Sequence, residues 1–128
     1  MSAMLEFWDD GKFYQIRILQ VRRARGHGRN CYLSVFNVGT IHCPFSLKKI
    51  FELTKAFNFV DAQRCYVLNP EAVVRLFHHQ HHYAVLDNGE EVYVTEEAYK
   101  ILQKYRAAKL NNSRPPSSEG GFFPLFPN

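Results

Sequence analysis

The stretch VVRLFHHQHHYAVLDNGEEVYVT, from Val73 to Thr95, decides the expected fold class of this chain. Valine, leucine, phenylalanine and tyrosine, which favour strands, stand on both sides of four histidines and return after Asp87-Asn88-Gly89. An Asn-Gly pair between strand-like runs is a strong signal for a tight hairpin turn. We therefore expect three antiparallel strands, at residues 73–78, 83–86 and 91–95.

The N-terminal half has a similar pattern around a polar, glycine-containing segment. KFYQIRILQV (12–21) and CYLSVFN (31–37) are strand-like, and RRARGHGRN (22–30) between them is expected to be a loop. A further short strand is expected at 41–45 after a turn at 38–40. Two strands that flank a glycine loop predict a hairpin.

Two segments change to the period of a helix. SLKKIFELTKAF (46–57) repeats apolar residues every three or four positions, and Ser46 is a suitable N-cap. Residues 95–108 predict a second helix, with Thr95 as N-cap and two glutamates in the first turn, where acids favour the helix dipole. The side chains expected to face inward on it are Tyr99, Ile101, Leu102 and Tyr105.

Length and composition indicate one domain, followed by a polar linker and a hydrophobic C-terminal tail. The chain has 128 residues, and its aromatic fraction of 15% favours sheet. We expect a domain at 1–110, followed at 111–128 by a linker, NNSRPPSSEG, and a hydrophobic tail, GFFPLFPN. The tail either docks onto its own domain or is taken by a protein partner.

Several classes of protein are not expected. No apolar run is long enough for a transmembrane helix, and the acidic N-terminus MSAMLEFWDDG does not suit a signal peptide, so we expect a cytoplasmic protein. Cys31, Cys43 and Cys65 are an odd number in apolar surroundings, which predicts reduced, buried thiols. No paired carboxylates, phosphate-binding glycine loop or Ser/His/Asp order supports an enzyme, and no cofactor is expected.

The charges are unevenly distributed along the chain. The formal net charge is +4, and residues 11–51 hold eight basic side chains and no acid. The basic residues are Lys12, Arg17, Arg22, Arg23, Arg25, Arg29, Lys48 and Lys49, whereas acids gather later, at 87–97. This asymmetry favours a polyanion facing one part of the surface.

The order and motifs of these elements resemble the LytTR family of bacterial DNA-binding domains, over residues 5–105. Phe45-Ser46-Leu47 begins the helix as in that family. VDAQRCYVLN (60–69) stands at the family's signature segment, where Tyr66, Leu68 and Asn69 match. Asp87-Asn88-Gly89 and Val94-Thr95 match the end of the pattern.

The resemblance implies a mainly β fold with short helices, built as an elongated stack of small antiparallel sheets. It also implies that loops at one edge contact the major groove and the phosphates of double-stranded DNA, and that a homodimer can form there on neighbouring half-sites. Because no receiver domain precedes the matching segment, we expect a stand-alone transcriptional regulator.

Three places correspond to the family's DNA-contacting positions. They are the loop at 22–30, with His27 or its neighbours in contact, then Gln63 with Arg64, and then Glu96, where the family often has arginine. The implied DNA-binding residues are Arg22, Arg23, Arg25, His27, Arg29, Asn30, Gln63 and Arg64. If about four arginines pair with phosphates, log K should fall against log salt with a slope of roughly −3.6.

Departures from the family keep a second hypothesis open. Gln63, Cys65 and Glu96 replace residues usual in the pattern, and a carboxylate is repelled by phosphate even though it can accept a hydrogen bond from cytosine. The alternative is a LytTR-like fold used for protein–protein interaction, with DNA binding weakened or lost. The hydrophobic tail also favours it.

The histidines at 78, 79, 81 and 82 raise the question of a metal. Their spacing suits ligation only on a helix or a bent loop, and no acid or cysteine lies nearby in sequence, whereas a structural zinc needs four ligands. We therefore expect no metal. The cluster is predicted to be a polar hairpin tip that protonation can charge, and that could then touch phosphate.

Overall fold

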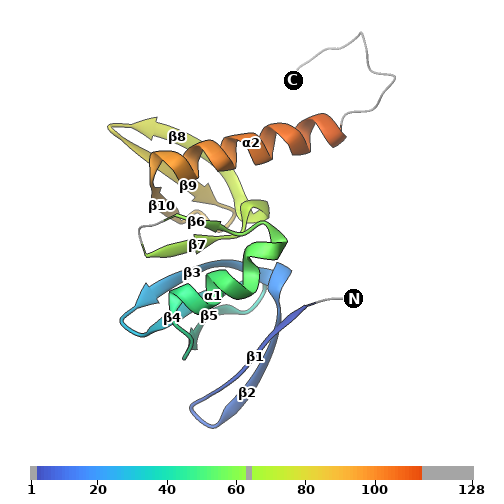
Figure 1. The fold of residues 1–128 in the computed structure, drawn as a ribbon, viewed down its shortest axis with the longest axis vertical. Helices are drawn as coiled ribbons and strands as arrows, with labels where there is room; N and C mark the ends of the chain where they lie inside the picture. Colours follow the sequence, from blue (N-terminus) through green and yellow to red (C-terminus); the bar gives the residue numbers. More distant parts are fainter. Residues whose placement is uncertain (1–2, 63–64, 114–128) are drawn as a thin grey trace.

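A computed structural model describes residues 3–62 and 65–113, and of 111–113 only the backbone. It contains three small antiparallel sheets stacked along the long axis of the molecule, with two helices beside them (Figure 1). The predicted mainly β class and stacked architecture are confirmed. The predicted tail, GFFPLFPN, lies outside the described residues.

The first sheet is a two-stranded hairpin at one end of the stack. It pairs β1 (Met4–Asp9) with β2 (Lys12–Arg17). Alternate side chains such as Leu5, Phe7 and Ile16 are buried, while Trp8 and Phe13 on the other face are exposed. We did not predict β1. The β2 strand is shorter than expected, because a 3-10 turn, η1 (Ile18–Gln20), separates it from the next strand.

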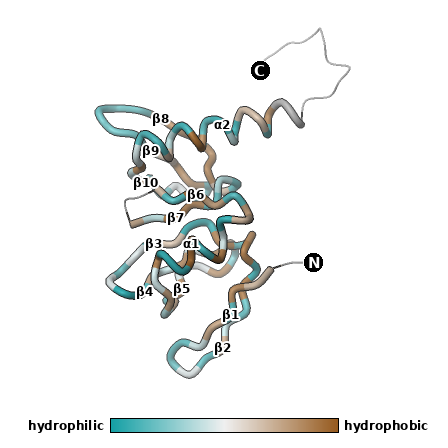
Figure 2. The backbone as a smooth tube through the Cα atoms, in the orientation of Figure 1, coloured by the Kyte–Doolittle hydropathy of each residue, from teal (hydrophilic) through white to brown (hydrophobic). Residues whose placement is uncertain are grey.

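The middle sheet has the strand order β5-β4-β3-β7-β6. Its strands are β3 (Val21–His27), β4 (Asn30–Val35), β5 (Gly39–Cys43), β6 (Val60–Asp61) and β7 (Tyr66–Leu68). Its two faces contribute to two separate cores: Ala24 and Leu33 pack with the hairpin and the first helix, whereas Leu68 packs with the third sheet. Figure 2 shows apolar segments within the stack and hydrophilic hairpin ends.

The expected loop at 22–30 is wrong for most of its length. These residues form β3, the central strand of the middle sheet, which pairs with both β4 and β7. Backbone hydrogen bonds on both sides outweigh the weak intrinsic strand preference of arginine and glycine, since strand propensity depends strongly on context. Only Gly28 and Arg29 remain as the turn.

The third sheet has the order β10-β9-β8, with β8 (Val73–His79), β9 (His81–Leu86) and β10 (Glu91–Val94). The predicted Asn-Gly turn is confirmed: Gly89 has φ 89°, and the Asn88 side chain accepts a hydrogen bond from the Glu90 amide at 3.1 Å. The histidines lie within β8 and β9, at the end of their hairpin, and Gln80 makes the turn with φ 64°.

Both predicted helices are present with their predicted caps. Helix α1 (Leu47–Thr54) starts where Ser46 Oγ accepts a hydrogen bond from the Lys49 amide at 3.1 Å, and it continues as η2 (Lys55–Phe57). Helix α2 (Glu96–Ser113) begins after Thr95, whose hydroxyl accepts from Ala98. Leu102 is buried as predicted, but Ile101 is 52% exposed, because the sheet covers only one side of α2.

The remaining 3-10 turn, η3 (Pro70–Ala72), connects the middle sheet to the third. Asn69, which caps it, is fully buried. The prediction of buried thiols is confirmed for Cys31 and Cys43 and is wrong for Cys65, which is exposed. No helix in the described parts of the chain is long and apolar enough to span a membrane.

Candidate nucleic-acid interface

The exposed end of the β3–β4 hairpin holds three of the predicted DNA-binding residues. Arg25 and His27 project from the last part of β3, Arg29 lies in the turn, and all three are exposed. Gly28 occupies the left-handed region with φ 62°, which glycine adopts at low cost and which lets the chain reverse in two residues. The turn therefore presents guanidinium and imidazole groups to solvent. Figure 2 shows that this hairpin end is hydrophilic.

The base of the same hairpin uses its arginines differently. Arg23 is only 8% exposed; its Nε donates to Glu90 at 3.0 Å, and its terminal nitrogen donates to the Tyr32 carbonyl at 2.9 Å. Arg22 donates to Asp87 at 2.6 Å and lies over the ring of Phe36, 4.4 Å from its centre. Both arginines thus tie the middle sheet to the β9–β10 turn of the third sheet.

Sheet register places Arg25 in a row of polar and aromatic side chains. Arg25 is paired with Tyr32 of β4 on one side and with Tyr66 of β7 on the other, and Tyr32 is paired with His42 of β5. All three neighbours are partly exposed. Directly paired residues point to the same face of a sheet, so this row forms one continuous surface across four strands.

Ring contacts hold this surface in place. The His27 ring meets the Tyr32 ring edge to face with centroids 5.5 Å apart, and the Tyr32 ring meets His42 at 5.2 Å. His42 Nδ1 lies 2.9 Å from a carboxylate oxygen of Asp9 in β1. The hairpin end is therefore supported from the first sheet. Sequence reasoning missed Tyr32, His42 and Tyr66, because their alignment depends on strand register.

The signature segment and the start of α1 lie beside the hairpin. The amide of Gly26 donates to the carbonyl of Cys65 at 2.7 Å, and a Cβ added at Gly26 would lie 3.4 Å from Leu47 Cδ2. A larger side chain at Gly26 would push these three segments apart. The predicted contacts Gln63 and Arg64, which directly precede Cys65 in sequence, lie outside the described residues.

Asn30, the last predicted contact in the hairpin, is half-buried at the start of β4. With its amide nitrogen directed inward, it donates to the Pro44 carbonyl at 3.1 Å. This hydrogen bond links the hairpin end to the segment that leads into α1. The side chain can therefore support the turn from within.

Two thiols lie under the hairpin end. Cys31 is paired with Gly26 on one side and with Cys43 on the other, and both thiols are fully buried. The hydrogen bond to Cys43, together with burial, raises the pKa of Cys31 above its usual range. A thiol held neutral in this way packs as a small apolar group rather than acting as a nucleophile.

The β8–β9 hairpin ends on the same side of the molecule as the β3–β4 hairpin (Figure 1). His78 and His82 are cross-strand partners whose rings stack with centroids 4.3 Å apart, and His82 also contacts Tyr99 of α2. His81 Nδ1 lies 2.8 Å from the Tyr93 hydroxyl. Among the residues the structure describes, no three histidine, cysteine or acidic side chains form a group suited to a metal ion.

Glu96, the predicted departure from the family, is exposed in the first turn of α2. Its carboxylate lies 3.3 Å from Lys100 Nζ, one helical turn further on. This ion pair partly compensates the negative charge at the surface. Helix α2 begins on the same side of the molecule as the two hairpin ends (Figure 1), so the acid stands at the margin of the candidate interface.

The combined geometry suits recognition of a polyanion rather than covalent chemistry. The exposed arginines offer planar forks that match phosphate or the guanine edge. The hairpin end projects from a sheet whose opposite face is packed on a core, so these groups stand on a rigid support. A narrow two-stranded ribbon is one of the elements that the major groove of DNA admits.

Comparison with known proteins identifies the fold. No family model matches the sequence, and the search of curated proteins gives no match. A solved structure, the LytTr DNA-binding domain of a protein from Bacillus cereus described as a methyl-accepting/DNA response regulator, superposes with a TM-score of 0.65. The match covers 81% of this chain and 95% of that domain, at 17% sequence identity. The chain therefore has the fold of a LytTr DNA-binding domain.

Proposed function

We propose that this protein is a transcriptional regulator that binds double-stranded DNA in a sequence-dependent manner and has no catalytic activity. The β3–β4 hairpin end would contact the major groove and the phosphates, with Arg25, His27 and Arg29 as its principal contacts. The observation that carries the proposal is the exposure of these three side chains on a rigid projection of a fold shared with a DNA-binding domain.

The other sequence-predicted contacts take different places in this proposal. Gln63 and Arg64 remain candidates because they directly precede Cys65, which is hydrogen-bonded to the hairpin. Asn30 supports the turn. Arg22 and Arg23 are engaged by Asp87 and Glu90, so they contribute to the shape of the site and not to phosphate neutralisation.

The ion pairs change the expected salt dependence. With Arg22 and Arg23 neutralised internally, two hairpin arginines remain, and together they predict a log–log salt slope of about −1.8. A phosphate contact by Arg64 would steepen the slope to about −2.7. Both slopes are shallower than the slope expected for four free arginines. The measured slope therefore reports how many cationic side chains contact phosphates.

The test is fluorescence anisotropy of the full chain with DNA duplexes enriched by selection and with scrambled duplexes, at a series of salt concentrations. Arg25→Ala combined with Arg29→Ala should weaken binding at low salt by about 10- to 100-fold, as expected for two lost charge-assisted contacts. The double variant should also bring the salt slope close to that of Arg64 alone.

A matched control removes cations elsewhere on the surface. Lys104→Ala combined with Lys109→Ala changes the net charge by the same amount on α2, away from the hairpin, and should leave the affinity nearly unchanged. If the control pair and the hairpin pair weaken binding equally, the interaction is nonspecific and the proposed interface is wrong. A wild-type protein without salt-sensitive binding at micromolar concentration would also refute it.

A second function, protein–protein interaction on the same fold, is favoured by the exposed carboxylates of Glu96 and Glu97 at the start of α2. Acids at this edge would repel phosphate and attract a basic partner. Glu96→Arg separates the two functions: it should strengthen DNA binding if this edge faces DNA and leave it unchanged if the edge faces a protein. Homodimerisation on DNA and a cytoplasmic location belong to the first proposal and follow from a regulator that acts at neighbouring half-sites.

A further inference from the structure

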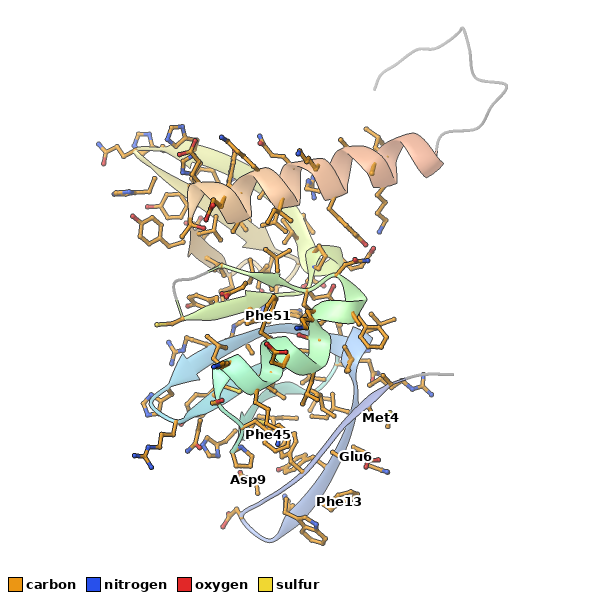
Figure 3. All side chains as sticks on the ribbon, in the orientation of Figure 1. Met4, Glu6, Asp9, Phe13, Phe45 and Phe51 are labelled. Carbon is orange, nitrogen blue, oxygen red and sulfur yellow. The ribbon has the colours of Figure 1, made fainter. Side chains whose placement is uncertain are left out.

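An apolar hollow lies between α2 and the segment that leads from α1 to β6. It has a volume of about 690 Å³ and is lined by Phe51, Phe59, Val60, Ile101 and Tyr105, with Lys55 and Lys104 among the residues at its margin. Figure 3 shows Phe51 on the side of α1 that faces α2, and Phe45 on the opposite side of α1 toward β1 and β2. The hollow therefore lies on the third-sheet side of α1.

The hollow leaves apolar surface in contact with solvent. Ile101 lies on the side of α2 that the sheet does not cover; it is 52% exposed and borders the hollow. Phe51 and Tyr105 are only partly buried. Exposed apolar surface rimmed by charged residues is typical of a site that is covered by another segment.

The chain carries a segment of matching chemistry. GFFPLFPN, at 121–128, places four large apolar side chains, Phe122, Phe123, Leu125 and Phe126, within five positions. Pro124 and Pro127 lack an amide proton, so this segment is poorly suited to extending the edge of a sheet. Proline-containing extended segments dock instead into grooves lined by aromatic side chains, such as this one.

The chain between α2 and the tail is long enough for the tail to reach the hollow. Lys104 lies nine residues before Ser113 on α2, which is about 14 Å at the rise of an α-helix. The eight residues from 114 to 121 can span up to about 26 Å when extended. Glu119, the one acid in this stretch, would pass near the lysines at the margin of the hollow. A short tether also gives the tail a high effective concentration at this site.

From these observations we infer that the GFFPLFPN tail docks into the hollow between α2 and the α1–β6 segment of its own domain. The hollow opens between the end of α1 and the middle of α2, on the other side of the molecule from the β3–β4 turn (Figure 1). The docked tail would therefore cover apolar surface without blocking the proposed DNA contacts. This inference goes beyond the proposed function and does not depend on it.

The test is methyl NMR of the full chain with labelled isoleucine, leucine and valine methyl groups. Docking predicts cross-peaks between the Ile101 methyl groups and ring protons of the tail phenylalanines, in addition to any from Phe51 and Phe59 of the hollow. Only the additional cross-peaks should be lost in Phe123→Ser combined with Phe126→Ser. Both substitutions lie outside the two described hydrophobic cores, so those cores keep their own side chains. The spectrum of buried Leu102 reports on that directly.

Two substitutions in the folded domain, one inside the hollow and one outside it, provide the reciprocal test. Ile101→Gln changes an exposed residue of the hollow and should shift the tail resonances, whereas Leu53→Gln, 41% exposed on α1 and not part of its lining, should not. The methyl groups of Val74 border a second hollow, between η3 and the C-terminal part of α2, and should also keep their shifts. Cross-peaks to Val74 instead of Ile101 would overturn the assignment of this site.

Dilution of the protein distinguishes docking of the chain's own tail in the hollow from docking of the tail of a second copy. Docking within one chain keeps the Ile101 shift constant as the protein is diluted, whereas a tail inserted into a second copy gives a concentration-dependent shift and contradicts the inference. If the Ile101 signals are identical in the wild type and the tail variant at every concentration, the tail does not occupy the hollow. The inference is then wrong, and a separate protein would be the remaining candidate for the tail.

Discussion

The base and the end of the β3–β4 hairpin carry the same kind of residue and use it in opposite ways. At the base, Arg22 and Arg23 make ion pairs with the β9–β10 turn, and Arg23 is almost completely buried. At the end, Arg25 and Arg29 face solvent. The difference arises because the third sheet covers one part of the strand and not the other. A count of basic residues therefore overestimates the charge available to a ligand.

Arg23→Ala gives the sharpest test of this comparison. It removes the hydrogen bonds of a buried guanidinium to both carboxylate oxygens of Glu90 and to the Tyr32 carbonyl, and leaves these groups without their partner. We expect a loss of about 3 kcal/mol in the free energy of unfolding, measured by urea denaturation. Arg25→Ala, two residues further along the same strand, should lower the free energy of unfolding by roughly 0.5 kcal/mol or less.

For DNA affinity we expect the opposite order of the two substitutions. Arg23→Ala should reduce affinity only as far as it reduces the folded fraction, whereas Arg25→Ala should weaken binding by a fully folded protein. Equal stability losses in the two variants would mean that the base and the end of the hairpin are not different environments. The comparison would then fail.

Asn69→Ala tests the base of the hairpin without changing charge. The Asn69 side chain donates to the Val21 carbonyl at 2.9 Å and accepts from the Glu71 amide at 2.9 Å, and the residue is 1% exposed. Truncation leaves buried backbone groups unpaired, so unfolding should become easier by about 2 kcal/mol. Thermal unfolding checks this, with Asn30→Ala at the other end of the hairpin as the comparison. A loss below that of Asn30→Ala would contradict the expectation.

The smallest expected effect is a loss of folding stability at alkaline pH, and it arises from the thiols under the hairpin end. The folded state keeps Cys31 protonated because the hydrogen bond to Cys43 and burial raise its pKa, whereas the unfolded thiol ionises in the ordinary range of a thiol. The unfolded state therefore loses a proton first, and stability present below pH 9 declines above it. The same hydrogen bond lowers the pKa of Cys43, and this opposes part of the effect. Between pH 8.5 and 10 we therefore expect a small net decline in the free energy of unfolding from the two thiols.

Cys31→Ala isolates this contribution, since other groups also titrate in the alkaline range. The variant starts from a lower stability but should lose less of it between the two pH values, as measured by urea denaturation. Hydrogen exchange should place the alkaline opening at β4 and β5, which carry the two thiols. A parallel decline in both proteins would show that the thiols do not contribute.

Local chemistry made several elements predictable from the sequence. The Asn88-Gly89 turn, the Ser46 and Thr95 caps and the buried Leu102 depend on residues close together in the chain, and all were found as expected. The order of these motifs also sufficed for the resemblance to the fold. The β1 strand was missed, since its outward face carries Met4, Glu6 and Trp8 and mixes polar with apolar residues.

The segment at 22–30 could not be assigned from its composition. Its two glycines and four arginines favour a loop, yet pairing with β7, some 40 positions later in the chain, makes it a central strand. The same long-range pairing decides which arginines are buried. Asp87 and Glu90 were recognised as part of an acidic region, but nothing near them in sequence identifies Arg22 and Arg23 as their partners.

The register of β3 limits how this protein can diverge. Successive residues of the strand face opposite sides of the middle sheet, so inserting or deleting one residue between Arg23 and His27 would exchange outward and inward side chains along the whole segment. Homologues should therefore vary this segment by substitution while keeping its length. Insertions should be accepted instead at the Asp10-Gly11 turn, where the added residues would extend away from the stack.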